Sequence, residues 1–277
     1  MSVRLPRVLM AMIVGMGLSV SGAAYQAIFG NPLVSPHILG VASGAGFGAS
    51  IGILVSGGVL FVQGMALGFG LLAVGLVMLI STVGKRGQLY VIVLSGVIVN
   101  SLFDALVSLT KYLADPQSKL PSIVIWLMGS LSTTSYRDLY TSGILIVLCV
   151  LVIFAIRWRL NLLSLNEEEA ESLGIDVRKS RAIIIILSTL ITAAAVSSCG
   201  VIGWIGLVIP HASRIFVGTD HRMLIPVSAM GGAIYLLLID NVARSATSQE
   251  LPLSILTAII GAPFFAYILR RRGKENS

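Results

Sequence analysis

The sequence predicts an all-helical membrane protein, a single polytopic transmembrane bundle over residues 1–277. Apolar residues make up 56% of the chain and charged residues 11%, against roughly 25% charged residues in soluble domains. The apolar residues fall in runs of about 20, the length of a membrane-spanning helix, whereas a membrane β-barrel would show alternating strands of about 10 residues. Lipid is therefore expected to act as solvent for much of the chain.

Nine apolar runs are long enough to be read as spans. In chain order they are Val8–Phe29, Ile38–Val55, Val59–Thr82, Leu89–Thr110, Leu139–Ile156, Ala182–Cys199, Ile202–Val217, Met223–Asn241 and Leu253–Arg270. A further stretch, Ile123–Leu131, is too short to cross a bilayer. We expect it to form a re-entrant or surface helix.

The basic residues orient these spans. Alternation along the chain collects most of the 19 Lys and Arg residues on one side, which the positive-inside rule assigns to the cytoplasm. That side holds Lys85, Arg86, Arg157, Arg159, Arg178, Lys179, Arg181, Arg214, Arg222, Arg270, Arg271, Arg272 and Lys274. The C-terminus is then cytoplasmic, and Arg4, Arg7 and Arg244 lie outside. Because the basic residues flank apolar runs, the net charge of +7 reflects topology and not nucleic-acid binding.

Glycines at four-residue spacing predict close helix packing, since small residues let helix backbones approach each other in lipid. They are Gly40, Gly44, Gly48 and Gly52 in the second span, with Gly64 and Gly68 in the third.

The longest polar stretch, 161–181, lies on the cytoplasmic side. Asn166 is a suitable helix N-cap, Glu169 stands where a capping partner belongs, and Gly174 can end the helix. The stretch predicts a short acidic helix with Ala170 and Leu173 on one side. Its composition alone leaves open whether it is a solvated loop or a docking element for a cytoplasmic partner.

Charged side chains inside spans are costly and usually functional. Asp104 lies within the fourth span. Asp240 and Arg244 are spaced i, i+4 at the outer end of the eighth, so they can pair on one helix face. Asp104 suits either a substrate path or a buried hydrogen-bonding role.

The sequence offers little enzyme chemistry. Gly84-Lys85 is followed by Arg86, so no Walker A motif is present, and the three histidines lack metal-site spacing. Ser43 sits among glycines as in some intramembrane serine proteases, yet no histidine is clearly placed as its base. We therefore expect no catalytic residues, no bound metal and no cofactor in this chain.

Three stretches of the chain carry a family resemblance. The first holds Arg4-Leu5-Pro6-Arg7, Ser21-Gly22-Ala23, Gln26, Asn31-Pro32-Leu33, Pro36 and Leu39-Gly40-Val41; the second runs from Leu165 through Ala170 to Leu173-Gly174; the third holds Gly200 to His211, Arg214, Thr219-Asp220-His221-Arg222, Pro226, Asp240, Ala243-Arg244, Leu251-Pro252 and Gly261-Ala262-Pro263-Phe264. Together they resemble the permeases of iron-siderophore, haem and vitamin B12 ABC importers, and the resemblance runs nearly end to end. It implies ten spans, one of which would precede Arg4.

The resemblance also implies partners. Such a permease pairs with a second copy or a paralogue, binds two cytoplasmic ATPases that use ATP and Mg²⁺, and receives substrate from a periplasmic binding protein. The segment Leu165–Gly174 matches the family's ATPase-coupling element, which settles the open reading above in favour of docking. The matched coupling residues are Leu165, Glu168, Ala170, Leu173 and Gly174.

Two further sites follow from the resemblance. Arg4, Arg7 and Arg244 match arginines that meet glutamates of the binding protein, and Gln88, Leu89 and Tyr90 match a cytoplasmic gate. The sequence thus predicts an inner-membrane importer permease for an iron chelate, haem or a corrinoid. Two alternatives are a proton-coupled transporter with Asp104 and Asp240 as carriers, and an intramembrane hydrolase using Ser43.

Overall fold

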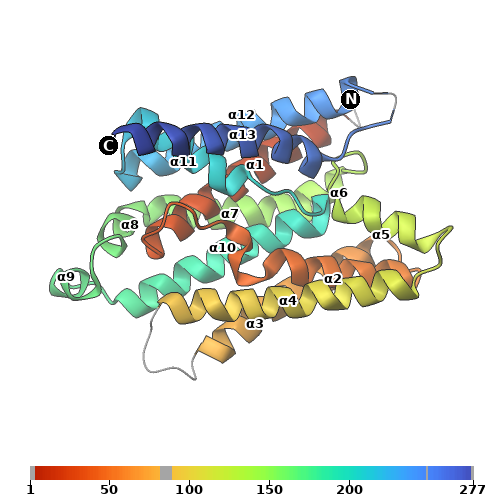
Figure 1. Cartoon of the computed structure of the whole chain (residues 1–277), viewed down its shortest axis with the longest axis horizontal. Coiled ribbons are helices and arrows are strands. Elements are labelled where there is room, and N and C mark those ends of the chain that lie inside the picture. The colour runs from red at the N-terminus through yellow and green to blue at the C-terminus, as the bar shows by residue number, and fades with distance from the viewer. Residues whose placement is uncertain (1–3, 82–88, 248, 276–277) are drawn as a thin grey trace.

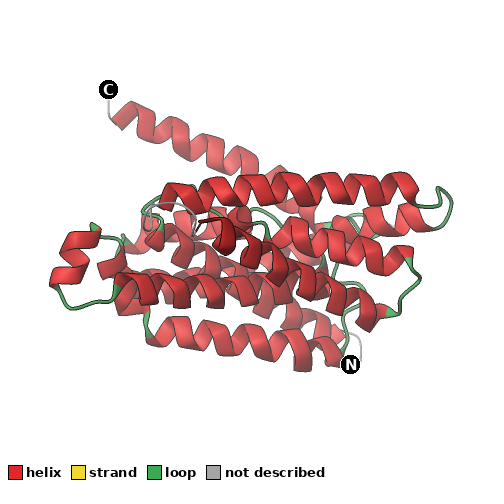
Figure 2. Ribbon diagram, turned by 90° about the horizontal axis from the view of Figure 1, so that it is seen from below, coloured by secondary structure: helices red, strands yellow, loops and turns green. Residues whose placement is uncertain are grey.

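The computed structural model describes residues 4–81, 89–247 and 249–275, and over these residues every regular element is a helix. Most of the long helices lie side by side in one bundle, and the C-terminal helix α13 angles away from it (Figures 1 and 2). The elements are α1 (Arg4–Ile28), η1 (Pro36–Leu39), α2 (Val41–Leu54), α3 (Val59–Ser81), α4 (Leu89–Leu113), α5 (Lys119–Leu127), α6 (Tyr136–Asp138), η2 (Leu139–Gly143), α7 (Ile144–Ala155), α8 (Arg157–Leu163), α9 (Glu167–Ser172), α10 (Val177–Cys199), α11 (Ile205–Val217), α12 (His221–Ser245) and α13 (Leu253–Glu275).

Six helices in the described part of the chain are long and apolar enough to cross a membrane. They correspond to the first, third, fourth, fifth, sixth and eighth predicted spans. The other three spans contain shorter apolar helices, Val41–Leu54, Ile205–Val217 and Leu253–Ala266. The count of nine crossings stays a prediction, whereas the all-helical membrane fold is confirmed.

The helices α2 and α11 begin later than hydropathy predicted. At 14 and 13 residues, each is about 20 Å long, against a hydrocarbon core of about 30 Å. Each follows a stretch whose backbone leaves the helical region, with positive φ at Gly40 before α2 and at Gly200 and Trp204 before α11. Hydropathy alone misses such breaks because the residues around them remain apolar.

The first helix, α1, forms the centre of the bundle. It packs against α12, α10, α11 and α7, and most of its residues are buried. Two glycine pairs permit this packing: a Cβ on Gly15 would overlap the backbone of Gly232 in α12, and a Cβ on Gly22 would overlap Gly206 in α11. The backbones of α1, α11 and α12 are therefore in direct contact.

The glycine pattern in the second and third spans is confirmed only in part. Gly44 and Gly48 pack against the backbone of α3 at Phe69 and Met65. By contrast, the space beside Gly64 and Gly68 is open, so these two glycines do not lie in a helix contact within the chain. The predicted short helix between the fourth and fifth spans is present as α5.

Candidate functional site

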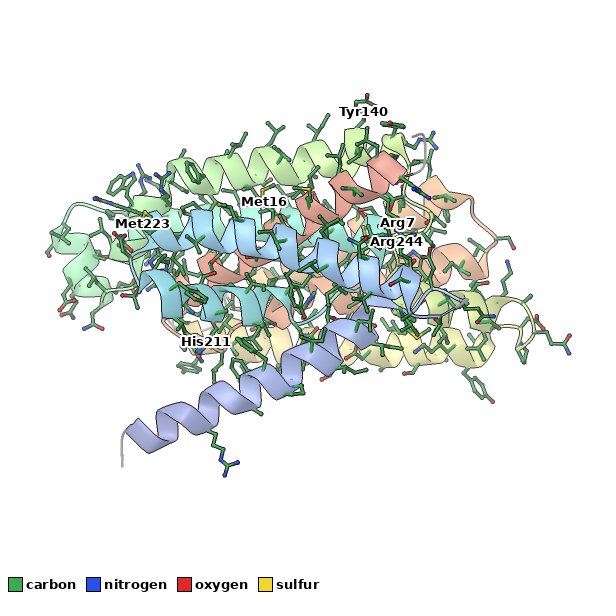
Figure 3. All side chains as sticks on the ribbon, turned by 90° about the horizontal axis from the view of Figure 1, so that it is seen from above. Arg7, Met16, Tyr140, His211, Met223 and Arg244 are labelled. Carbon is green, nitrogen blue, oxygen red and sulfur yellow. The ribbon has the colours of Figure 1, made fainter. Side chains whose placement is uncertain are left out.

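The functional residues expected from the sequence separate to opposite ends of the bundle. Figure 3 places Arg7 and Arg244 at one end, and His211 and Met223 toward the other. The short helices α8 and α9 lie at that second end (Figure 1). The bundle therefore offers two candidate sites, one at each end.

The predicted acidic helix exists as α9, and it projects beyond the bundle. Ala170 is buried, whereas Leu165 and Leu173 are 42% and 59% exposed, and Glu168 is also exposed. The helix ends at Ser172, and Leu173 follows it as the C-cap residue. Two apolar side chains therefore flank α9 in solvent-accessible positions, as in a protein-docking element.

The ends of α9 follow the sequence prediction incompletely. Asn166 is the N-cap residue, but its side chain makes no capping hydrogen bond. Gly174 adopts φ 80° and its N–H donates to the carbonyl of Glu171, so it ends the helix as expected. An ion pair between Arg181 and Glu167 at 3.1 Å fastens α9 to α10. Asp176 caps α10 by accepting from the N–H of Lys179, and this contact lowers the pKa of the Asp176 carboxyl.

At the opposite end, the guanidinium of Arg7 is buried between two carboxylates. Its Nε lies 3.0 Å from both oxygens of Asp240, and its Nη2 lies 2.7 Å from Oδ1 of Asp240. Its Nη1 and Nη2 also donate to Glu250 at 2.7 and 2.9 Å. These contacts join α1 to α12 and to the loop before α13. The Arg7 hydrogen bonds hold the pKa of the Glu250 carboxyl below its usual range.

This ion triad corrects the expected pairing of Asp240 with Arg244. Asp240 is completely buried and its partner is Arg7, 233 residues away in sequence. Arg244 instead donates to the side chain of Asn241, one turn earlier in α12. Arg4 is exposed at the start of α1. Of the three arginines expected to dock a binding protein, Arg7 has its guanidinium turned into the bundle.

The predicted gate falls at a boundary of the described residues. Gln88 lies outside them, Leu89 begins α4, and Tyr90 is exposed. Further along α4, Asp104 is exposed on the surface of the single chain. Ser43 donates to Oδ1 of Asn100 at 2.6 Å and to the carbonyl of Gly40. Among the residues described, no cluster of three or more His, Cys, Asp or Glu side chains could hold a metal ion.

Sequence reasoning missed a polar cluster beside the predicted coupling segment. Asn161 in α8 donates from Nδ2 to Asp220 at 2.7 Å, and its Oδ1 accepts from the backbone N–H of His221 at 2.8 Å. Nearby, Arg214 in α11 donates to Gln26 at 2.5 Å. The only signal was that Gln26, Arg214 and Thr219–Arg222 belong to the stretches that carry the family resemblance.

This cluster borders a hollow of about 560 Å³ between the end of α1, α8 and the loop from α11 to α12. The hollow is lined mainly by polar side chains, including those of Asn31, Ser164 and His211. The hollow therefore lies beside the polar face of α8, while Leu160 and Leu163 on the same helix are buried in the hydrophobic core.

Comparisons with known proteins agree with this architecture. A model of the FecCD transport family matches residues 1–271. The chain is 48% identical to the molybdate import system permease protein of Haemophilus influenzae, over 99% of this chain and 82% of that protein. It is 41% identical to a probable iron chelatin transport system permease protein of Helicobacter pylori, over 99% and 83%.

A solved structure supports the same assignment. The inward-facing form of a metal-chelate type ABC transporter shares 45% identity and superposes with a TM-score of 0.94, covering 98% of this chain and 86% of that chain. The relatives are named as permeases, so this chain is a transport component and not an enzyme. Together with its apolar helices, these matches establish that the chain belongs to the FecCD transport family of multi-pass ABC-importer permeases.

Proposed function

We propose that this chain forms half of a dimeric inner-membrane pathway that imports a metal-containing solute into the cytoplasm, with its C-terminus on the cytoplasmic side. Two partner ATPases supply ATP and Mg²⁺ chemistry, and a periplasmic binding protein delivers the substrate. The observation that carries this proposal is α9, which projects from one end of the bundle and has the exposed Leu165 and Leu173 at its two ends. Leu165, Glu168, Ala170, Leu173 and Gly174 form the coupling element.

The substrate proposal starts from the relatives. One relative with 48% identity is named for molybdate and another with 41% for iron chelatin. We therefore place molybdate beside ferric chelates as the first candidates, ahead of haem and corrinoids. All are metal-containing solutes, and the periplasmic binding protein would largely discriminate between them.

The decisive experiment reconstitutes the permease with its ATPase and binding protein in liposomes. We expect uptake of one of these solutes to require ATP and both partners. Molybdate, a ferric siderophore, haemin and cobalamin would be compared at equal concentration. Uptake driven by a proton gradient without ATP would contradict the proposal and would favour a secondary transporter using Asp104.

The docking proposal for the outer end assigns direct contact to Arg4 and Arg244. Arginine suits this role because its planar guanidinium can bind a carboxylate through two hydrogen bonds. Arg7 would support docking indirectly, since its guanidinium is held by Asp240 and Glu250. At the inner end, Gln88, Leu89 and Tyr90 would narrow the exit of the pathway between the two permease copies.

A further inference from the structure

We propose that Asn161 is a positioning residue that connects the ATPase-coupling segment to α12, so that movement of the segment is passed to this helix. The inference rests on the proposed importer function and names the route by which its coupling element acts. Asn161 lies in α8, the helix that directly precedes the coupling segment. The polar contacts of its side chain are with the residues that begin α12.

These contacts form a compact network. The Asn161 amide donates to Oδ1 of Asp220 at 2.7 Å, and its carbonyl oxygen accepts from the backbone N–H of His221 and lies 2.8 Å from His221 Nδ1. Asp220 is also the N-cap of α12, accepting from the N–H of Arg222 at 2.9 Å. One side chain in α8 therefore bonds to the residues that define where α12 starts.

A second contact reinforces the same junction. Arg157, at the start of α8, donates from Nε to the carbonyl of Arg222 at 3.1 Å. Both contacts run from α8 to the first turn of α12. On another side, the hollow of about 560 Å³ separates α8 from the loop that follows α1. The helix α8 is thus held by two kinds of contact: Leu160 and Leu163 are buried in the hydrophobic core, and the polar contacts fix its register against the start of α12.

The other end of α12 explains why this junction matters. The helix has 25 residues, so it extends about 37 Å. Near its outer end it holds Asp240, which binds Arg7 of α1, and Arg244, which lies on the proposed docking face. Along its length it is in backbone contact with α1 at Gly232. A shift applied at Asp220 would therefore be passed along α12, through Pro226, to the part of the helix that is packed on α1.

The test uses the reconstituted complex of permease, ATPase and binding protein. For each variant we would measure assembly with the ATPase, basal ATP hydrolysis, and the stimulation of hydrolysis by loaded binding protein. Asn161→Ala should assemble and keep basal hydrolysis while stimulation falls about tenfold or more. That change is the size expected from loss of a hydrogen bond to a charged group.

Exchanging the side chains of Asn161 and Asp220 distinguishes the effect of their hydrogen bond from a general structural role of the two residues. Asn161→Asp places two carboxylates together and should lose stimulation, whereas Asp220→Asn still accepts the Asn161 amide and should remain near wild type. The double variant Asn161→Asp/Asp220→Asn reverses the direction of the hydrogen bond and should restore stimulation to within about threefold. Ser164→Ala is the matched control, because Ser164 is the C-cap residue of α8, three residues after Asn161, and its hydroxyl donates to the carbonyl of Leu160 within the same helix.

Each result of these measurements either supports or overturns the proposed role of Asn161. Wild-type stimulation in Asn161→Ala would overturn the inference, and so would a double variant no better than Asn161→Asp. Failure of both Asn161 single variants to assemble would also overturn it, since a purely structural role would then suffice. If the wild-type permease itself gives no ATP-dependent response with either partner, the proposed importer function fails instead.

Discussion

Replacing Arg7 with alanine should destabilise the protein strongly, because it leaves the carboxylate of Asp240 buried without its partner. Asp240 is 0% exposed, and Arg7 itself is 8% exposed. Removing one partner of a buried ion pair costs about 3–5 kcal/mol in measured cases. For a chain of this size, that corresponds to a fall in Tm of roughly 6–20 °C.

The two arms of the triad should contribute unequally. The side chain of Glu250 is 38% exposed, so water can solvate its carboxylate when Arg7 is absent. Glu250→Gln should therefore cost much less than Arg7→Ala, about 1 kcal/mol, because the solvent-accessible partner is changed and Arg7 keeps its contact with Asp240. In Arg7→Met/Asp240→Asn the buried charge is removed together with its partner, and we expect at least about 2 kcal/mol of the Arg7→Ala loss to be recovered.

Thermal unfolding of the purified permease in detergent, followed at one heating rate for all variants, would measure these differences. Equal losses from Arg7→Ala and Glu250→Gln would refute the reasoning. So would a double variant that unfolds as early as Arg7→Ala. Either result would mean that the Arg7–Asp240 contact does not stabilise the bundle, and Arg7 would return as a candidate for direct contact with the binding protein.

Four further predictions concern the two ends of the bundle. Leu173→Asp should abolish uptake while membrane insertion stays normal, because it places charge on the apolar surface beside α9; uptake equal to wild type would reject the coupling role. Arg244→Glu should weaken binding-protein association, most visibly at low ionic strength, with little change in Tm; unchanged affinity in vesicle pull-downs would reject docking. Leu89→Cys should crosslink to its dimer mate in the closed state, and no crosslink in any nucleotide state would count against the gate. Stability should also fall as pH drops through the lowered pKa of Glu250, below its ordinary value of 4.5, because a carboxylate with a depressed pKa stabilises the fold only while ionised; Glu250→Gln should flatten that part of the pH profile.

The lengths of the apolar runs and the helix-capping residues were sufficient to predict much of the fold. Apolar length identified the helices, and the cap residues Asn166 and Gly174 placed both ends of α9. They could not locate the starts of α2 and α11, because Gly40 and Trp204 break the helices by their φ angles within apolar sequence. Hydropathy reports how favourably a residue transfers into lipid, and this value is the same on either side of such a break.

The ion pairs show a different limit. The i, i+4 spacing of Asp240 and Arg244 is a valid helical pair, yet Asp240 binds Arg7 from a helix at the other end of the chain. The reason is the close packing of α1 on α12, which depends on Gly15 and Gly232 facing each other. A spacing rule applies within one helix, whereas this contact depends on how two helices cross. Asn161 and Asp220 were missed for the same reason.

The position of Arg7 changes how docking at the outer end would act. Arg4 lies at the start of α1, and Arg244 lies at the end of α12. The Arg7–Asp240 pair joins these two helix ends, and the Gly15–Gly232 contact joins them again deeper in the bundle. A partner that binds Arg4 and Arg244 would therefore act on α1 and α12 as one tightly packed pair and not as two independent helices. Since α12 also begins at the contact with Asn161, the helix pair provides a continuous connection from the proposed docking face to the coupling segment.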